Sequence, residues 1–419
     1  MAIFRIEGPV TLNGRVRISG AKNSILPIIA ASLLAEGESV FEEVPHLKDV
    51  EIMCELVESL GAKVKFSPKE SRLTVDPANV ENILAPYELV NKLRASFLVM
   101  GPLLAKKGQA KISLPGGCAI GSRPVDLHLK GFVAMGASII YNHGYIEARV
   151  NRRLKGSKIY LDFPSVGATE NIMMAATLAK GQTIIENAAI EPEVVDLSTY
   201  LVSMGADIRG AGTDTIKING TDKLKGSTHT IIPDRIEAGT FMVAAAITGG
   251  DVIIENVVPS HLKPVSAKLR EANIEIAEEL TSIHIKAGKK IKSLDIKTHP
   301  YPGFPTDMQA QMTSLMAKAT GTSMIVETIF ENRFMHVNEL KRMGARIKID
   351  GRSAIIEGAM KLMGTQVKAT DLRAGAALII AALAAEGTSE IIDVEHVDRG
   401  YVSIDQKLRQ LGAKIERFD

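Results

Sequence analysis

The sequence predicts an α/β protein made of two α/β domains, each pseudo-threefold, built from six repeats of about 70 residues with buried central helices walled by sheets. Two independent series of glycines lead to this prediction. One ends amphipathic helices with a Gly-Ala pair, at Gly61, Gly136, Gly205, Gly344 and Gly412, and has Asn273 in the glycine's place in the fourth copy. The other ends Ala-rich helices, at Gly37, Gly108, Gly181, Gly250, Gly321 and Gly387. Because both series return at the same spacing, they indicate one repeated unit.

Each repeat is expected to contain a helix, a strand, a second helix and two further strands. In the last copy the helices are predicted over 370–386 and 406–411, and strands over 390–394 and from 413 onward. The second helix is amphipathic: in the first copy one face carries Met53, Leu56, Val57 and Leu60. The first helix is apolar nearly all round, as in 374–383, so it must be buried on every side. We therefore expect three such helices at the centre of each domain.

The start of the chain predicts a β-hairpin over 10–18, because apolar residues alternate on both sides of Asn13-Gly14. We expect the first strand to pair back onto the C-terminal half. The extended stretch 229–233 is the expected crossing between domains. The predicted domains are therefore 1–21 with 231–419, and 22–230.

Composition excludes several classes of protein. The 419 residues include 50 basic and 48 acidic side chains, and this near-zero balance argues against a general binder of nucleic acid or of membrane surfaces. The longest apolar runs, 25–35 and 374–385, are shorter than the roughly 20 residues of a membrane span. The start is strand-like and carries no signal-peptide segment. With only two cysteines, a disulfide framework is excluded and a cytoplasmic location is expected.

Cofactor motifs are missing from the sequence. It has no Walker loop, no GxGxxG opening a helix and no Cys/His spacing suited to a metal, so we expect neither metal nor cofactor. The methionines at 308, 312 and 316 recur at helical spacing and are expected in the core. The expected partners are small molecules.

Charged side chains stand at the predicted starts of the buried helices. A helix start favours anions, so the cations Lys22, Arg94 and Arg373 oppose the dipole there. They are either solvated charges or parts of an anion site. The acids Asp234, Asp307 and Asp371 are either helix caps or members of the same site. If the helices of each domain run parallel, their starts gather in one cleft, which suits a polyanionic ligand held between the domains.

The stretch 114–124 reads as a loop that we expect to be mobile, because it contains three glycines and two prolines. Its thiol, Cys118, lies five residues from Arg123 and is expected to be exposed with a lowered pKa. The alternative is an incidental surface cysteine. Cys54 lies in a helix among apolar residues and is expected to be a packing residue. The clusters 327–336 and 396–400 could each be ordinary strand-to-helix connections.

Seven motifs, in this order, resemble the UDP-N-acetylglucosamine enolpyruvyl transferases over essentially the whole chain. They are G-A-K-N at 20–23, P-G-G-C-A-I-G-S-R-P-V-D-L-H at 115–128, S-V-G-A-T-E at 165–170, F-P-T-D-M-Q-A-Q at 304–311, E-N-R-F-M-H at 331–336, T-D-L-R-A at 370–374 and H-V-D-R-G-Y at 396–401. The resemblance implies two inside-out domains. It also implies transfer of the enolpyruvyl group of phosphoenolpyruvate to the sugar 3-hydroxyl, by addition and elimination without a cofactor. This is the first committed step of peptidoglycan precursor synthesis.

The resemblance also implies roles for individual residues. The implied catalytic residues are Cys118, Asp307, Lys22 and Arg399. Cys118 is implied to be the general acid, to form a covalent adduct with phosphoenolpyruvate and to be the target of fosfomycin, whereas Asp307 is implied to deprotonate the sugar hydroxyl. The implied ligands of phosphoenolpyruvate are Lys22, Asn23, Arg123, Arg333, Arg373 and Arg399. The implied ligands of the nucleotide sugar are Asn23, Arg94, Arg123, Pro124, Val125, Asp126, Leu127, Ser165, Val166, Gly167, Asp307 and Ile329. Many family members carry a lysine shortly before S-V-G-A-T, where this chain has Phe163-Pro164.

Two further functions stay open. A sister activity on shikimate 3-phosphate shares the fold and chemistry, but the P-G-G-C loop and the E-N-R-F-M-H cluster argue against it. A catalytically silent regulator is expected to bind the nucleotide sugar without releasing phosphate. The presence of Lys22, Cys118, Asp307, Arg333, Arg373 and Arg399 together argues against that reading.

Overall fold

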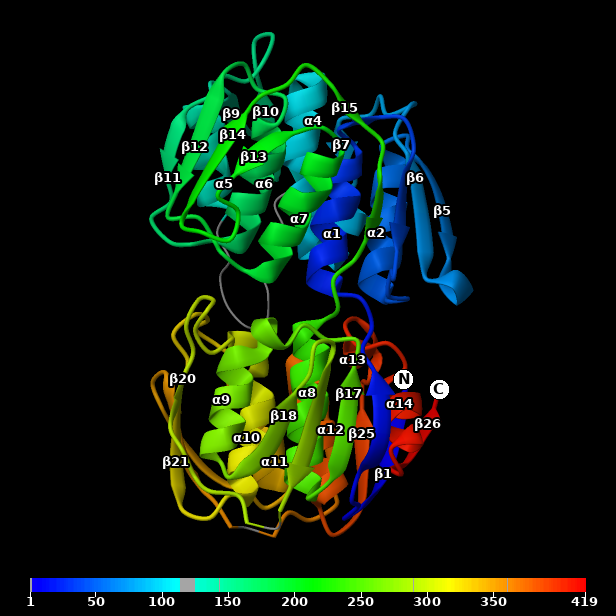
Figure 1. Ribbon diagram of the computed structural model, residues 1–419, viewed down its shortest axis with the longest axis vertical. Helices are drawn as coiled ribbons and strands as arrows, with labels where there is room; N and C mark the ends of the chain where they lie inside the picture. Colours follow the sequence, from blue (N-terminus) through cyan, green and yellow to red (C-terminus); the bar gives the residue numbers. More distant parts are fainter. Residues whose placement is uncertain (1, 114–124, 143, 289, 360) are drawn as a thin grey trace. The chain divides into compact units, whose positions relative to one another are not determined.

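The computed structural model describes residues 2–113, 125–142, 144–288, 290–359 and 361–419. These residues form two compact units (Figure 1). We call residues 2–19 with 233–419 the terminal unit, and residues 20–113 with 125–232 the inserted unit. Each unit is described by itself below.

The inserted unit repeats the predicted order of helix, strand, helix, strand, strand. Its helices are α1 (Lys22–Ser32), α2 (Lys48–Ser59), α3 (Tyr87–Lys92), α4 (Met100–Lys107), α5 (Asp126–Ala134), α6 (Val166–Ala176) and α7 (Pro192–Ser203), with short η1 (Pro68–Glu70) and η2 (Arg94–Val99). Its strands are β3 (Ala35–Glu36), β4 (Ser39–Glu42), β5 (Lys63–Ser67), β6 (Arg72–Asp76), β7 (Leu84–Ala85), β8 (Gln109–Ser113), β9 (Ser138–Asn142), β10 (Tyr145–Arg149), β11 (Lys158–Tyr160), β12 (Gln182–Glu186), β13 (Asp207–Arg209), β14 (Thr215–Asn219), β15 (Leu224–Lys225) and β16 (Thr228–Thr230).

The terminal unit has the same plan. Its helices are α8 (Arg235–Thr248), α9 (Lys263–Glu271), α10 (Gln309–Lys318), α11 (His336–Arg342), α12 (Leu372–Ala384), α13 (Glu395–Asp398) and α14 (Ile404–Gln410), with η3 (Pro259–Leu262) and η4 (Thr306–Met308). Its strands are β1 (Ile3–Gly8), β2 (Asn13–Arg17), β17 (Asp251–Glu255), β18 (Ile274–Glu278), β19 (Ser282–Ala287), β20 (Ile296–Lys297), β21 (Thr322–Val326), β22 (Arg346–Asp350), β23 (Ser353–Glu357), β24 (Gln366–Lys368), β25 (Gly387–Ile392) and β26 (Lys414–Phe418).

The sheets confirm the repeat. The described part of each unit contains three four-stranded sheets, with orders β24-β25-β1-β26, β18-β19-β17-β2 and β20-β21-β23-β22 in the terminal unit. Those of the inserted unit are β16-β4-β6-β5, β7-β8-β10-β9 and β11-β12-β14-β13. In each sheet one edge strand runs parallel to the strand that follows a buried helix, and the other pairs are antiparallel. The six copies therefore share one topology.

Buried helices fill the centre of each unit, as predicted. In the terminal unit α8, α10 and α12 contact one another, and α12 is buried from Arg373 to Ala384 (Figure 1). In the inserted unit α1, α4 with η2, and α6 have this place. Met308, Met312 and Met316 are fully buried in the terminal core, which confirms the interpretation of their spacing.

The predicted N-terminal hairpin is wrong. β1 lies between β25 and β26, antiparallel to both, whereas β2 lies in another sheet, parallel to β17. The type I′ turn that Asn-Gly favours needs positive φ at both central residues, and here Gly14 has φ 121° while Asn13 is paired as a strand residue. The expected return of the first strand to the C-terminal half is confirmed. In the described ranges no helix is both long enough and apolar enough to cross a membrane.

Candidate active site

The three aspartates at helix starts of the terminal unit have two different roles. Asp234 caps α8, since its Oδ1 accepts hydrogen bonds from the amides of residues 236 and 237 at 2.7 and 3.0 Å. Asp371 caps α12 in the same way, with distances of 2.8 and 3.0 Å. Asp307 lies inside η4 and caps no helix. For Asp307 the capping alternative is therefore wrong.

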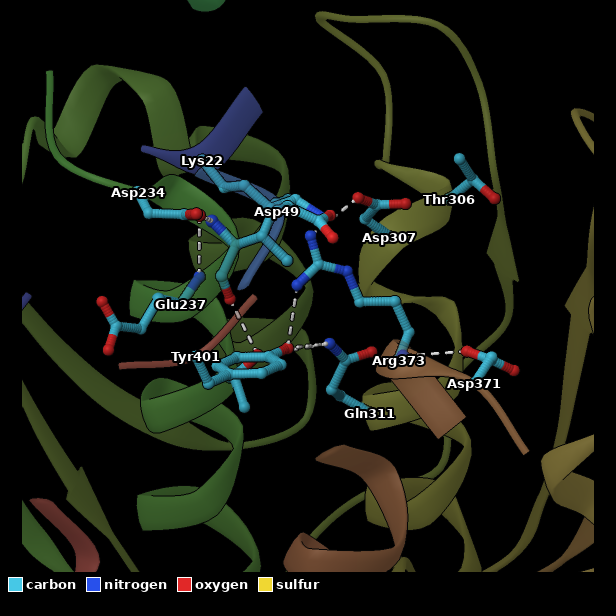
Figure 2. Close-up of polar contacts among 12 residues, drawn as sticks. Lys22, Asp49, Asp234, Glu237, Thr306, Asp307, Gln311, Asp371, Arg373 and Tyr401 are labelled. Atoms are coloured by element: carbon cyan, nitrogen blue, oxygen red, sulfur yellow. Dashed lines mark hydrogen bonds and ion pairs between the residues drawn. The ribbon is translucent and has the colours of Figure 1, made fainter. Parts of the chain in front are cut away.

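The carboxylate of Asp307 instead receives hydrogen bonds from two arginines. Nη2 of Arg333 donates to Oδ1 at 2.7 Å. Nη2 of Arg373 donates to Oδ2 at 2.9 Å (Figure 2). The arginine side chains are only 6% and 5% exposed, while the Asp307 side chain is 26% exposed. A carboxylate that solvent reaches is thus held by two buried cations. Arg373 is therefore buried and paired with a carboxylate, and the alternative that it is a solvated charge at a helix start is wrong.

Electrostatics keep Asp307 ionised in this arrangement. Burial by itself raises the pKa of Asp307, but the positive charges of Arg373 and Arg333 outweigh burial and hold its pKa well below the ordinary value. His336 is neutral at physiological pH, because burial lowers its pKa to about 4. The cluster therefore carries two fixed positive charges against one carboxylate, which suits a second, incoming anion.

The other arm of Arg333 connects the cluster to the stretch after β21. Its Nη1 donates to Oγ1 of Thr306 at 3.0 Å, and that hydroxyl donates to Oε2 of Glu327 at 2.8 Å. The buried Glu327 also accepts hydrogen bonds from Thr298 and from the amides of Ile329 and Phe330, at 3.0, 2.8 and 3.2 Å. The sequence left 327–336 open as an ordinary connection. The structure ties it to η4, which places Ile329 in the same region as Asp307.

Sequence reasoning missed three buried polar residues behind Arg373. Nη1 of Arg373 donates to the hydroxyl of Tyr401 at 3.1 Å, and Tyr401 in turn contacts Thr240 and Gln311 (Figure 2). For Thr240 and Gln311 the sequence did offer a signal, since each is a polar residue inside an apolar helix and a buried polar group needs a partner.

In the inserted unit the predicted cation Lys22 is held by a buried acid. Its ammonium lies 3.1 Å from Oδ2 of Asp49, and the two side chains are 12% and 4% exposed (Figure 2). Lys22 is therefore not a solvated charge. Asn23, the next residue of α1, is exposed, and Arg94 is half-buried at the start of η2.

The starts of α5 and α6 lie together in the inserted unit. His128, in the first turn of α5, lies against Gly167 in the first turn of α6, where an added Cβ would lie 3.2 Å from Cε1 of His128. Ser165 caps α6 by accepting a hydrogen bond from the amide of residue 168 at 3.3 Å. The structure thereby brings the candidate residues at 125–127 close to those at 165–167. Burial, and then the charge of Arg94, lowers the pKa of His128 to about 3.

The remaining predicted residues are more dispersed. Cys118, Arg123 and Pro124 lie outside the described residues. Arg399 is half-buried at the end of α13 in the terminal unit. Cys54 is buried, and burial raises its pKa to about 12, which confirms the packing interpretation. Within the described ranges His, Cys, Asp and Glu form no group of three that could hold a metal ion.

Comparisons with known proteins give the context of this geometry. The family model described as EPSP synthase (3-phosphoshikimate 1-carboxyvinyltransferase) matches residues 6–408. The chain is 63% identical over 414 residues to UDP-N-acetylglucosamine 1-carboxyvinyltransferase 1 of Caldanaerobacter subterraneus subsp. tengcongensis, covering 99% of both chains. It is 60% identical over 419 residues to UDP-N-acetylglucosamine 1-carboxyvinyltransferase 2 of Carboxydothermus hydrogenoformans, covering 100% of this chain and 99% of that one.

Solved structures share the fold. The enolpyruvyl transferase NikO from Streptomyces tendae superposes with a TM-score of 0.90 at 26% identity, covering 100% of this chain and 99% of that one. An EPSP synthase from Acinetobacter baumannii has a TM-score of 0.79 at 22% identity, covering 100% of both chains, and shows likeness of fold alone.

Proposed function

Since the chain belongs to the EPSP synthase (3-phosphoshikimate 1-carboxyvinyltransferase) family, we propose that it transfers the enolpyruvyl group of phosphoenolpyruvate to the 3-hydroxyl of UDP-N-acetylglucosamine and releases phosphate. The observation that carries the proposal is Asp307 held between two buried arginines, in a chain 55–63% identical to proteins named for this reaction. The reaction starts peptidoglycan precursor synthesis, and we place it in the cytoplasm.

The arginine pair suits the carboxylate of phosphoenolpyruvate. A guanidinium can bind a carboxylate through two parallel hydrogen bonds, and Arg333 and Arg373 each already donate one hydrogen bond to the carboxylate of Asp307. We assign the phosphate group to Lys22, Asn23, Arg123 and Arg399. Binding the substrate's carboxylate shares the arginines between two anions. The pKa of Asp307 then rises, because each arginine stabilises its charge less.

This rise is what makes Asp307 a usable base. In the proposed reaction Asp307 removes the proton of the sugar 3-hydroxyl, and the oxygen bonds to C2 of phosphoenolpyruvate. The thiol of Cys118 delivers a proton to C3, which gives a tetrahedral ketal. Loss of phosphate from C2 and of a proton from C3 then restores the double bond. Acid–base assistance of this kind contributes about 10²- to 10⁴-fold to a rate.

We assign to the nucleotide sugar the residues that the family resemblance implies. Its proposed ligands are Asn23, Arg94, Arg123, Pro124, Val125, Asp126, Leu127, Ser165, Val166, Gly167, Asp307 and Ile329. The placement of 125–127 beside 165–167 supports this assignment. We also propose that 1–21 with 231–419 form the domain of the base, that 22–230 form the domain of Cys118, and that Cys118 is the residue modified by phosphoenolpyruvate and fosfomycin.

Phosphate release from phosphoenolpyruvate tests the proposal, with UDP-N-acetylglucosamine or shikimate 3-phosphate as acceptor. We expect release with the nucleotide sugar only, and at least a hundredfold loss of kcat in Cys118→Ala and Asp307→Asn. Cys54→Ala is the matched control, since that thiol is buried in packing, and it should keep kcat. Release with shikimate 3-phosphate alone would assign the sister activity. Tight binding of the nucleotide sugar without release would assign a silent regulator.

A further inference from the structure

The second arm of Arg373 points to a residue that the reaction itself does not need. Nη2 of Arg373 reaches Asp307 at 2.9 Å, while its Nη1 donates to the Tyr401 hydroxyl at 3.1 Å (Figure 2). The guanidinium carbon also lies 5.4 Å from the centre of the Tyr401 ring. Because a guanidinium has donors only, each arm needs an acceptor when it is buried. Asp307 supplies one acceptor and Tyr401 supplies the other.

The hydrogen bonds around Tyr401 have one consistent proton assignment. Thr240 donates to the backbone oxygen of Ile236 at 2.8 Å, so its single proton is used there. The hydroxyl of Tyr401, 3.0 Å from Oγ1 of Thr240, must then be the donor in that contact. Nε2 of Gln311 donates to Oγ1 of Thr240 at 3.2 Å and to the Tyr401 oxygen at 3.3 Å. The lone pairs of the Tyr401 oxygen are left to accept from Gln311 and Arg373.

The position of Tyr401 makes this arrangement rigid. Its side chain is 1% exposed, and its partners come from the three central helices: Thr240 from α8, Gln311 from α10 and Arg373 from α12. One phenol oxygen therefore contacts all three helices: the first turns of α10 and α12, and the second turn of α8. A helix shift that moved Arg373 away from Asp307 would also break the contacts of Tyr401.

We propose that Tyr401 is a positioning residue, which holds the guanidinium of Arg373 in the orientation that keeps Asp307 in place for proton removal. This inference rests on the proposed function, because it gives Asp307 the role of base. Thr240 and Gln311 orient the phenol, and the phenol orients Arg373. Tyr401 itself touches neither Asp307 nor any reacting atom in this arrangement.

The charges around Asp307 indicate how loss of the Tyr401 hydroxyl should change the dependence of kcat on pH. Arg373 and Arg333 face Asp307, Asp234 and Tyr401 act on Arg373, and His336 lies near Arg333. Without the Tyr401 oxygen the Nη1 arm has no acceptor there, and Arg373 can turn away from Asp307. Its charge then lowers the pKa of Asp307 less. The acidic limb of kcat, along which Asp307 takes up a proton, therefore moves to higher pH.

The test compares Tyr401→Phe with Tyr200→Phe in the full chain. Tyr200 is a matched control: it is 0% exposed, its hydroxyl donates to Ser39 at 2.8 Å, and it lies in α7 of the inserted unit. Phosphate release is measured against pH for both variants and the wild type. We expect Tyr401→Phe to lose about tenfold to a hundredfold in kcat, as for a lost hydrogen bond to a charged group, and to show the shifted limb. Tyr200→Phe should show neither change.

A wild-type pH profile in Tyr401→Phe would overturn the proposal, as would equal changes in the two variants. If Tyr401→Phe does not fold, Thr240→Val decides the question, because it removes the hydroxyl that orients the phenol and leaves the Tyr401 oxygen beside Arg373. A limb shifted in the same direction but by less supports the proposal, and an unchanged limb overturns it.

A direct readout separates this proposal from the proposed function. In protein labelled with carbon-13 at the aspartate carboxyls, the Asp307 signal is identified by its loss in Asp307→Asn. Its titration should move to higher pH in Tyr401→Phe even if the wild type releases no phosphate.

Discussion

Asp234, Asp307 and Asp371 occupy equivalent places in the repeat but have different structural roles. Two of them cap helices through backbone amides, whereas Asp307 binds the side chains of Arg333 and Arg373. The difference arises because two arginines reach position 307, and a buried guanidinium attracts a carboxylate more strongly than backbone amides do. The symmetry of the repeat is therefore broken where the candidate site lies.

Arg333 should not tolerate replacement by lysine. Its fork contacts Asp307 and Thr306 at once, at 2.7 and 3.0 Å, and a single ammonium cannot reproduce both contacts. We expect Arg333→Lys to raise the KM for phosphoenolpyruvate by about tenfold or more, as for one lost charged hydrogen bond. Arg352→Lys, at an exposed arginine that contacts Glu331, is the control and should leave KM unchanged. An unchanged KM in Arg333→Lys would remove this residue from the binding site.

Glu170 should make the protein less stable as pH rises. Its carboxyl is buried in α6, and burial, followed by the charges of Glu193 and Glu191, raises its pKa well above the ordinary value. The folded state then keeps a proton that the unfolded chain releases, so stability is full below about pH 4.3 and declines as pH rises through the folded-state pKa. We expect Glu170→Gln to increase the free energy of unfolding at about pH 7.5 by roughly 1 kcal/mol or more, with little effect near pH 4.

Urea denaturation at the two pH values measures this difference. Glu81→Gln, at an exposed position, is the control and should change the free energy of unfolding by less than about 0.5 kcal/mol. A stabilisation by Glu170→Gln that is equal at both pH values would contradict the linkage argument.

At the scale of elements, the repeats are closed by glycines that the sequence analysis did not single out. After β14 the amide of Gly220 donates to Gly181, and after β23 the amide of Gly358 donates to Gly321 at the equivalent place. A Cβ at Gly220 would lie 1.7 Å from the backbone oxygen of Ala179, and one at Gly358 would lie 2.0 Å from that of Ala319. The chain after β14 and after β23 can lie this close to the backbone at Ala179 and Ala319 only because these two glycines have no side chain.

We expect Gly220→Ala to lower the free energy of unfolding by at least about 2 kcal/mol, since backbone must move to admit the methyl group. Gly288 is the control: it follows β19 and has no atom within 4 Å of an added Cβ. Gly288→Ala should change stability by less than about 0.5 kcal/mol. Thermal or urea unfolding compares the two variants, and equal losses of stability would refute the steric explanation.

At the scale of the whole molecule, the two units differ in how their chains close. Every sheet of the inserted unit is made of strands from 35–230, whereas two sheets of the terminal unit depend on β1 and β2. β1 is a central strand with partners on both sides, so its removal leaves β25 unpaired on one edge and takes away the strand that β26 pairs with (Figure 1). An unpaired edge beside an exposed core favours aggregation.

Residues 20–232 produced alone should therefore fold and unfold cooperatively, while 233–419 alone should aggregate. Adding a peptide of residues 1–19 should restore solubility to the second fragment, because it returns both strands. Circular dichroism and gel filtration distinguish these outcomes. A soluble, cooperatively folded 233–419 fragment would show that β1 and β2 are dispensable.

Much of this architecture follows from local pattern. The spacing of the glycines indicates six repeats, and the all-round apolar helices indicate that these helices are buried. The period of the apolar residues along an element shows which of its sides meets solvent. The starts of the buried helices, and hence the cations Lys22 and Arg373, follow from the same pattern. The failed hairpin at Asn13-Gly14 marks its limit, since the true partners of β2 lie in β17, more than two hundred residues along the chain.

Only the tertiary structure decided which polar groups meet. Asp307 bonds to Arg333 and Arg373, at sequence separations of 26 and 66, and Thr240 meets Tyr401 at a separation of 161. No local pattern encodes such pairs, because they form where the N-terminal parts of three helices come together. The sequence by itself determined the repeat, the buried helices and the kinds of charge at their starts. The fold determined that one aspartate became the counter-ion of two arginines and that one tyrosine became an acceptor for Arg373, because burial makes each donor depend on an acceptor close by in space.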